Sequence, residues 1–401
     1  MLMYDFRSSG VVRNVIRIAA AAQHAGLEVE IWVVRRQGDL LATVPPNIPV
    51  VALAQGPAIG PRALDSMMTV GRLAHAITSR RPAILFSGGN HSHLYAALGL
   101  LISGKRRALR FVGRASNAVV SATGGRWRRA IRPFERFQYA VMDRIVAVSD
   151  ELRGDLASLA PRPSRVSAVP NGIDLAQVER SSPVDVVHPF FAPGAPPLVL
   201  GIGRLSRQKN FDGLLRAFAV ARQHRPLSLM ILGSGPPRAF SRLRSLAAQL
   251  GIGDDVVLAG FVPDPVAYLK RADLFVLSSR WEGASNVLLE ALASGCPIVA
   301  TRAPTGVAEV LKHGEVAPIV PVGDERALAG AMLRRLAEHR NAHALRRRAS
   351  DFDLSRTLSA YVRILSEEYD RAVHVERAAL AAPRARNHGE WAGASFPGGR
   401  R

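Results

Sequence analysis

Two glutamates on either side of a turn of small residues are the part of this sequence best suited to chemistry. Residues 279–301 read SRWEGASNVLLEALASGCPIVAT, so Glu282 and Glu290 flank Gly283-Ala284-Ser285-Asn286. Asn286 is expected to begin a helix, whose first amides lack intrahelical acceptors and carry partial positive charge. A phosphate can bind such amides, and small residues let it approach closely. Because carboxylates suit hydroxyl groups, the pattern predicts hydroxyls, phosphates and hydroxyls, as in a nucleotide sugar.

A second loop adds two cations. Residues 201–210 read GIGRLSRQKN, which places Arg204 and Lys209 just before a helix expected to begin near Phe211. In open parallel sheets, ligands bind where strands end and loops enter helices, so we expect the two loops to meet. Two cations would then strengthen the binding of a diphosphate. Each residue alone has an ordinary alternative, since a Glu near a helix start complements the helix dipole and a basic loop can simply be solvated.

Strands and helices alternate along most of the chain. Residues 1–6 and 27–34 read as strands around a helix over 11–25, and a second series of strands begins at residue 197. Alternation of this kind predicts the α/β class, with two Rossmann-like doubly wound domains facing a cleft.

The composition suggests where these domains begin and end. We expect an N-terminal domain over residues 1–174, a Pro-rich linker over 175–197 and a C-terminal domain over 198–352. A helix over 353–375 stands apart from the second series. Residues 376–401 are rich in Pro, Gly and Arg, which predicts a disordered tail.

Length and charge limit the class of protein. A chain of 401 residues, 48% of them hydrophobic, can build two cores. It has no apolar run of the roughly 20 residues that a membrane span needs, and no signal-peptide pattern at its start, which predicts a cytoplasmic location. The formal charge of +21 favours anionic partners: nucleotides, a membrane surface or nucleic acid.

Five segments carry a resemblance to a known family: GRLSRQKNFDGLLRAF, LGSGP, VVLAGFVPD, YLKRADLFVLSSRWEGASNVLLEALASGCPIVAT and VPNGID. Together they resemble the retaining glycosyltransferases of family 4, which have the GT-B architecture. The resemblance extends to about residue 375 and is specific in the second domain but diffuse in the first. It implies that the N-terminal domain is on the acceptor side and that the helix over 353–375 crosses back to it.

The resemblance also implies a role for each matching residue. Arg204 and Lys209 would bind the donor diphosphate and stabilise the leaving nucleotide, Glu290 would hold the ribose, and Glu282 would contact the donor sugar. The remaining donor-binding residues would be the amides near the helix start, two glycines after a strand, two residues beside the base and a glycine from the first loop: Ser285, Asn286, Val287, Gly233, Gly235, Phe261, Val262 and Gly10.

The sequence departs from the family pattern on the acceptor side. Many members have a histidine after a central strand of the first domain, whereas this chain reads RFVGRASNAVV there. Either Asn117 and Arg114 take over the role, or it comes from SGGNHSHL, which contains Asn90, His91 and His93. Among these, Asn117 and His91 are the catalytic candidates that we carry forward.

The activity expected from the resemblance is transfer of a hexosyl or N-acetylhexosaminyl group. The donor would be a UDP-sugar, with a GDP-sugar as second choice, and the acceptor would be lipid-linked or a cell-envelope polysaccharide. No cofactor or metal is expected, because Arg204 and Lys209 would neutralise the diphosphate. The alternatives are a nucleotide-sugar epimerase of the same architecture, a catalytically silent relative that binds nucleotide sugars and, more distantly, a nucleic-acid-binding protein.

A basic segment points to a further partner. Residues 105–144 contain eleven lysines and arginines, with Trp127, Phe134, Phe137 and Tyr139 among them. This pattern favours peripheral binding to an anionic membrane at the inner face of the plasma membrane, and the alternative is a solvated basic surface. Nucleic acid is not expected as a partner, because no recognition element accompanies the charge.

Overall fold

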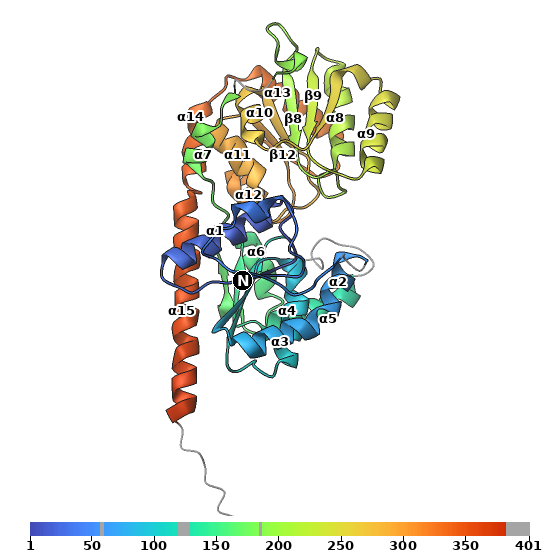
Figure 1. The fold of residues 1–401 in the computed structure, drawn as a ribbon. Helices are drawn as coiled ribbons and strands as arrows, with labels where there is room; N and C mark the ends of the chain where they lie inside the picture. Colours follow the sequence, from blue (N-terminus) through green and yellow to red (C-terminus); the bar gives the residue numbers. More distant parts are fainter. Residues whose placement is uncertain (57–59, 119–127, 184–186, 382–401) are drawn as a thin grey trace, which may run out of the picture.

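The computed structural model describes residues 1–56, 60–118, 128–183 and 187–381, which form two domains, each built on one parallel sheet (Figure 1). The N-terminal sheet has the order β3-β2-β1-β4-β5-β6-β7. Its strands are β1 (Leu2–Met3), β2 (Ile31–Val33), β3 (Val50–Ala52), β4 (Ile84–Ser87), β5 (Arg110–Ala115), β6 (Arg144–Ala147) and β7 (Val166–Ala168). The C-terminal sheet has the order β10-β9-β8-β11-β12-β13. Two doubly wound domains confirm the predicted fold class.

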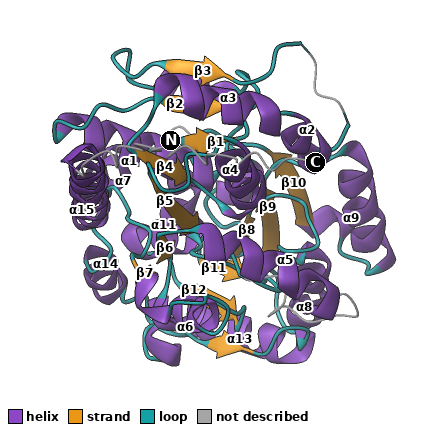
Figure 2. Ribbon diagram, turned by 90° about the horizontal axis from the view of Figure 1, so that it is seen from below, coloured by secondary structure: helices purple, strands orange, loops and turns teal. Residues whose placement is uncertain are grey.

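Helices cover the N-terminal sheet because its strands are apolar on both faces. Leu85, Phe86, Phe111 and Val112 are all buried, as expected for parallel strands between helical layers (Figure 2). The first helix begins at Gly10 and is capped by Ser9, whose hydroxyl accepts a hydrogen bond from the amide of Val12. The helices are α1 (Gly10–His24), α2 (Arg62–Met68), α3 (Val70–Arg80), α4 (Asn90–Ile102), α5 (Arg128–Val141) and α6 (Asp150–Ala157).

The C-terminal domain repeats this plan. Its strands are β8 (Leu198–Ile202), β9 (Ser228–Leu232), β10 (Val256–Gly260), β11 (Leu274–Leu277), β12 (Ile298–Thr301) and β13 (Ile319–Val320). Its helices are α8 (Phe211–Arg222), α9 (Pro237–Gln249), α10 (Pro265–Arg271), α11 (Asn286–Ser294), α12 (Val307–Val310), α13 (Glu325–Ala337) and α14 (Ala342–Ser350). Since all paired strands run parallel, their carboxyl ends lie along one edge of the sheet.

The chain crosses between the domains twice, and the two crossings are joined. The amide of Ile173 donates to the carbonyl of Phe352 (2.8 Å), and the amide of Leu354 donates to the carbonyl of Ile173 (3.0 Å). The first crossing leads into a short helix, α7 (Leu175–Arg180), within the stretch expected to be an irregular linker. The second leads into the long helix α15 (Leu354–Ala381).

Helix α15 runs down the side of the N-terminal domain and packs against α1, β4 and β5 (Figure 1). It continues to Ala381, so the prediction of a disordered tail from residue 376 is wrong for residues 376–381. Residues 382–401 lie outside the described part of the chain. Among the helices in the described residues, α15 included, none combines the length and apolar character needed to cross a bilayer.

Candidate active site

Glycines lie at three neighbouring strand ends beside the site, and two of them, Gly203 and Gly233, line its cavity. The amide of Gly203 donates to Leu232 and that of Gly233 donates to Gly260, which draws the ends of β8, β9 and β10 together. A Cβ atom at Gly233 would overlap the carbonyl oxygen of Gly203. Both residues also adopt a positive φ, 151° for Gly203 and 152° for Gly233. Only glycine fits both requirements, and the strand ends stay open to a ligand.

The two loops singled out in the sequence lie side by side. After β8, the loop containing Lys209 is tied to the loop after β11 by two hydrogen bonds between side chain and backbone. The Ser278 hydroxyl donates to the carbonyl of Lys209 (2.8 Å), and the Gln208 side chain donates to the carbonyl of Trp281 (3.0 Å). These contacts bring the predicted cations and the first predicted carboxylate into one place.

Lys209 and Glu282 form an ion pair. The Lys209 Nζ lies 2.6 Å from Glu282 Oε1, which also accepts a hydrogen bond from the Ser279 hydroxyl at 2.6 Å. Their side chains are 16% and 6% exposed, so solvent screens this pair weakly. The sequence assigned the two residues to different parts of a donor, whereas the structure joins them directly.

Helix α11 begins at the same edge. Its N-cap residue Ser285 is 7% exposed, and the Ser285 hydroxyl has no hydrogen-bond partner among the described residues. A buried hydroxyl without a partner is costly, and the first amides of a helix likewise lack acceptors within the helix. An anion or a hydroxyl-bearing ligand would satisfy both.

A cavity of about 190 Å³ lies between the domains beside these elements. The predicted donor-binding residues that line it are Gly10, Arg204, Gly233, Phe261, Val262, Asn286, Val287 and Glu290. Gly235 does not line it, because Gly235 packs against the Leu205 side chain. Lys209, Glu282 and Ser285 are not among the residues that line it.

Charges from α1 face the cavity from the opposite domain. Arg13 lines it together with Ser8 and Ser9. Burial away from water raises the pKa of the Glu290 carboxyl, while the positive charges of Arg13 and Arg17 oppose that rise. Cations of the N-terminal domain therefore lie within electrostatic range of the carboxylate that the sequence assigned to the ribose. Arg13 was not among the residues predicted from the sequence, although its position one turn after Gly10 could have indicated it.

The acceptor-side candidates separate into different environments. His93 is fully buried and its Nδ1 lies 2.8 Å from the Ser87 hydroxyl, so His93 is a core residue. Arg114 is also buried and does not line the cavity between the domains. Neither Arg114 nor His93 lines the cavity, and the residue that takes the role of the family histidine stays a prediction.

Asn117 lies at the contact between the domains, whereas His91 is in the first turn of α4 and does not line the cavity. Desolvation, with Arg62 and Arg204 nearby, lowers the pKa of His91 to about 4, so the imidazole is neutral at pH 7 although part of it is accessible. Asn117 pairs with Gly283 of the other domain in an antiparallel bridge. Its side-chain oxygen accepts a hydrogen bond from the amide of Ala118 and is thus occupied locally.

Family models match both domains. The model described as Glycosyltransferase Family 4 matches residues 8–177, and the model described as Glycosyl transferases group 1 matches residues 196–338. The chain belongs to glycosyltransferase family 4. This agrees with the resemblance found in the sequence.

The names of curated relatives of this chain refer to bacterial glycan synthesis. The chain is 31% identical over 166 residues to an N-acetylgalactosamine-N,N'-diacetylbacillosaminyl-diphospho-undecaprenol 4-alpha-N-acetylgalactosaminyltransferase of Campylobacter jejuni, covering 41% of this chain and 43% of that one. It is also 31% identical over 181 residues to the lipopolysaccharide core biosynthesis glycosyltransferase LpsE of Rhizobium meliloti, covering 44% and 52%. The matches thus span about half the length of these relatives, or less.

Solved structures share the fold over nearly the whole length. The Anabaena protein HepE, solved with UDP and glucose, superposes with a TM-score of 0.74 at 18% identity, covering 91% of this chain and 99% of that one. WaaG, described as a glycosyltransferase involved in lipopolysaccharide biosynthesis, gives 0.65 at 19% identity, covering 90% and 98%. These neighbours establish the GT-B fold.

The contact at Gly283 yields a prediction. A methyl group at Gly283 would overlap the carbonyl oxygen of Ser116 across the cleft. We expect Gly283→Ala to lower kcat/KM for glycosyl transfer at least tenfold by preventing closure, with little change in Tm because neither core is touched. Gly253→Ala is the control, since the nearest heavy atom to its added Cβ lies 4.0 Å away. Wild-type kcat/KM in Gly283→Ala would show that the contact is dispensable.

Proposed function

We propose that this chain is a retaining glycosyltransferase that moves a hexosyl or N-acetylhexosaminyl group from a UDP-sugar to a lipid-linked or polysaccharide acceptor of the cell envelope. A GDP-sugar is the second choice of donor. The proposal rests mainly on the interdomain cavity, where Arg204, Glu290 and the N-terminus of α11 surround one space. A diphosphate fits between the cation and the helix amides, and a ribose fits against the carboxylate.

The surroundings of the cavity support a nucleotide sugar as donor. Phe261 lines it with 55% of its surface exposed, which leaves an aromatic face for a base to pack against. The unsatisfied hydroxyl of Ser285 lies at the start of α11, where the sugar or the diphosphate would bind. HepE, which shares the fold, was solved with UDP and glucose and with UDP-glucose.

The paired Lys209 and Glu282 suggest how the leaving group is stabilised. In the free protein their charges neutralise each other. A bound diphosphate would attract the Lys209 ammonium from the side away from Glu282. Glu282 would keep the ammonium in place and accept hydrogen bonds from the sugar. The protein then supplies position and positive charge rather than a nucleophile. We expect no metal to be required.

Retention follows if the leaving phosphate takes the acceptor proton on the same face of the sugar. The neutral imidazole of His91, influenced by Arg204, could then hydrogen-bond the acceptor hydroxyl without repelling the donor. Asn117 would act mainly through its backbone, which fixes the turn around Gly283. The acceptor would enter from the side of the N-terminal domain.

The names of the relatives support a cell-envelope acceptor. The name of one relative includes a diphospho-undecaprenol substrate, and the name of another includes lipopolysaccharide core biosynthesis. A lipid-linked acceptor would require the enzyme to work at a membrane surface, peripherally at the inner face of the plasma membrane.

We place the proposed membrane contact on helix α5. Tyr139 is buried, so it cannot contact lipid, and Trp127 lies outside the described residues. Phe134 and Phe137 are 63% and 37% exposed on the same helix. Two exposed arginines, Arg132 and Arg136, lie next to these rings in the sequence of the helix. Two aromatic rings among cations suit insertion into an anionic lipid interface.

Removing the cations tests the proposed donor site. We expect Arg204→Ala and Lys209→Ala each to lower kcat about a hundredfold at saturating donor, because a cation near the leaving group contributes up to about 4 kcal/mol. Arg207→Ala is the matched control, since Arg207 is an exposed arginine of the same loop outside the cavity. The measurement is kcat with UDP-sugars and with GDP-sugars. Near-normal kcat in both variants would contradict the assignment.

Vesicle binding tests the proposed membrane surface. We expect the protein to sediment with vesicles containing anionic lipid and not with neutral ones, and the double variant Phe134→Ala/Phe137→Ala to bind at least fivefold more weakly. Val187→Ala removes an even more exposed apolar side chain elsewhere, 96% exposed, and should bind as the wild type does. Binding that is absent, or unchanged in the double variant, would rule out α5 as the contact.

A further inference from the structure

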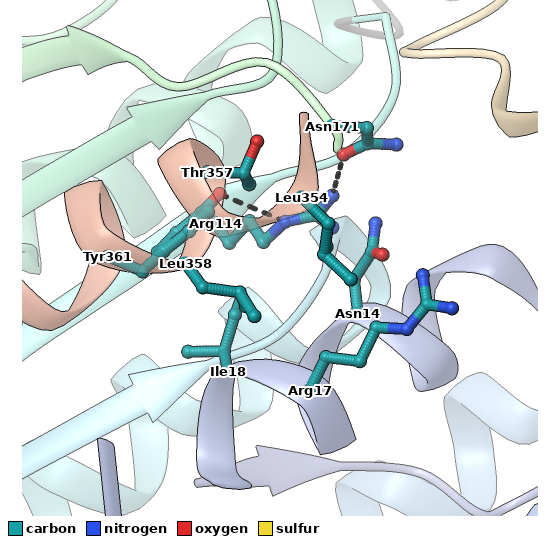
Figure 3. A pocket seen from close by; sticks show the side chains of 9 residues that line it. All are labelled: Asn14, Arg17, Ile18, Arg114, Asn171, Leu354, Thr357, Leu358 and Tyr361. Atoms are coloured by element: carbon teal, nitrogen blue, oxygen red, sulfur yellow. Dashed lines mark hydrogen bonds between the residues drawn. The ribbon is translucent and has the colours of Figure 1, made fainter. Parts of the chain in front are cut away.

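Arg114 is a buried cation that the catalytic proposal does not use. It lies on β5 and is 1% exposed, among the most deeply buried large side chains of the protein. Its Nε donates to the Tyr361 hydroxyl of α15 (3.1 Å), and its two terminal nitrogens donate to Gly88 and to Asn171 Oδ1 (2.5 Å), as Figure 3 shows in part. None of the ion pairs among the described residues includes Arg114.

A buried guanidinium without a carboxylate is costly, because neutral acceptors return only part of the lost hydration. An apolar side chain of similar size would fill the same space on β5 at lower cost. The role of Arg114 must therefore lie in what its hydrogen bonds determine. A guanidinium has five donors and no acceptor, so every group facing it must accept.

This property fixes the orientation of Asn171. Because Asn171 Oδ1 must face Arg114, its Nδ2 is turned toward the C-terminal domain. There Nδ2 donates to Asn286 Oδ1 (2.7 Å) and to the carbonyl of Ala284 (3.2 Å). Because Arg114 can only donate, it fixes the Asn171 amide so that its N–H group faces the C-terminal domain.

The orientation of Asn286 follows in the same way. Its Oδ1 is occupied by Asn171, so its Nδ2 faces the cavity side. A Cβ atom placed on Gly10 would lie 2.5 Å from Asn286 Nδ2, which locates this nitrogen at the cavity wall. Asn286 therefore offers an N–H donor, and not an oxygen, where an anionic ligand would bind.

We propose that Arg114 and Asn171 are positioning residues that fix the hydrogen-bond polarity of Asn286 for a nucleoside diphosphate. The inference rests on the proposed function and adds two residues, neither of which touches the donor. Tyr361 anchors Arg114 from α15, so the returning helix also supports the donor pocket. With the opposite amide orientation, an oxygen of Asn286 would face the phosphate oxygens and repel them.

Asn171→Asp tests this polarity with almost no change in shape. Aspartate still accepts from Arg114, and it supplies the carboxylate that the buried cation lacks. This ion pair offsets the lost hydrogen bond to the carbonyl of Ala284, so Tm should not fall. The aspartate cannot donate to Asn286 Oδ1, so the Asn286 amide must turn and place its oxygen toward the cavity. We expect calorimetric titration with UDP, and with GDP in parallel, to give a Kd at least tenfold higher than the wild type.

Arg114→Met is a second variant that does not depend on the aspartate. It replaces the buried charge with an apolar side chain, so the fold should be retained, and Asn171 becomes free to turn. We expect a Kd for UDP about threefold or more above the wild type. Thr357→Val is the control, because the Thr357 hydroxyl donates to the carbonyl of Pro170 in the surroundings of Arg114 without joining the chain of hydrogen bonds from Arg114 to Asn286.

The outcomes separate the inference from the proposed function. Weaker UDP binding in both variants, at unchanged or higher Tm and with a normal control, supports the positioning role. A Kd within twofold of the wild type in Asn171→Asp, or an equal loss in Thr357→Val, contradicts it. A wild-type protein that binds neither UDP nor GDP would contradict the proposed function itself, and the inference would fall with it.

Discussion

The site depends on one backbone contact between the domains. Gly283, in the loop before α11, lies against Ser116 and pairs with Asn117, where any side chain at 283 would overlap the opposite backbone. This contact brings the N-terminus of α1 and the N-terminus of α11 to the same cavity. Each parallel sheet presents the carboxyl ends of its strands to the cleft, so loops from both can act on one ligand.

Charge is distributed unevenly around that cavity. The C-terminal domain keeps Lys209 neutralised by Glu282, whereas Arg204 has no ion-pair partner among the described residues. The N-terminal domain adds Arg13 opposite Glu290. A diphosphate bound as we propose would therefore meet net positive charge and helix amides, and the carboxylates would lie where hydroxyl groups bind. Arg114 contributes from inside the protein, since its N–H donors orient the side-chain amides of Asn171 and then Asn286.

Local sequence was sufficient to predict the parts of the site that lie close together in the chain. The alternation of strands and helices gave the two domains, and the spacing from Glu282 to Glu290 placed both acids around the start of α11. It could not show that Lys209 pairs with Glu282, because that contact depends on how two loops pack. Burial of Arg114 was also out of reach, since the helix that covers it contributes Tyr361 from 247 positions later in the chain.

The account would be tested most directly by a crystal structure of the protein with bound UDP. It predicts the diphosphate between Arg204 and the first amides of α11, with the ribose hydroxyls on Glu290 and the Asn286 side-chain nitrogen toward the ligand. A complex in which UDP occupies another surface, or in which Arg204 and Glu290 remain untouched, would contradict the central claim that this cleft binds the diphosphate of an activated sugar.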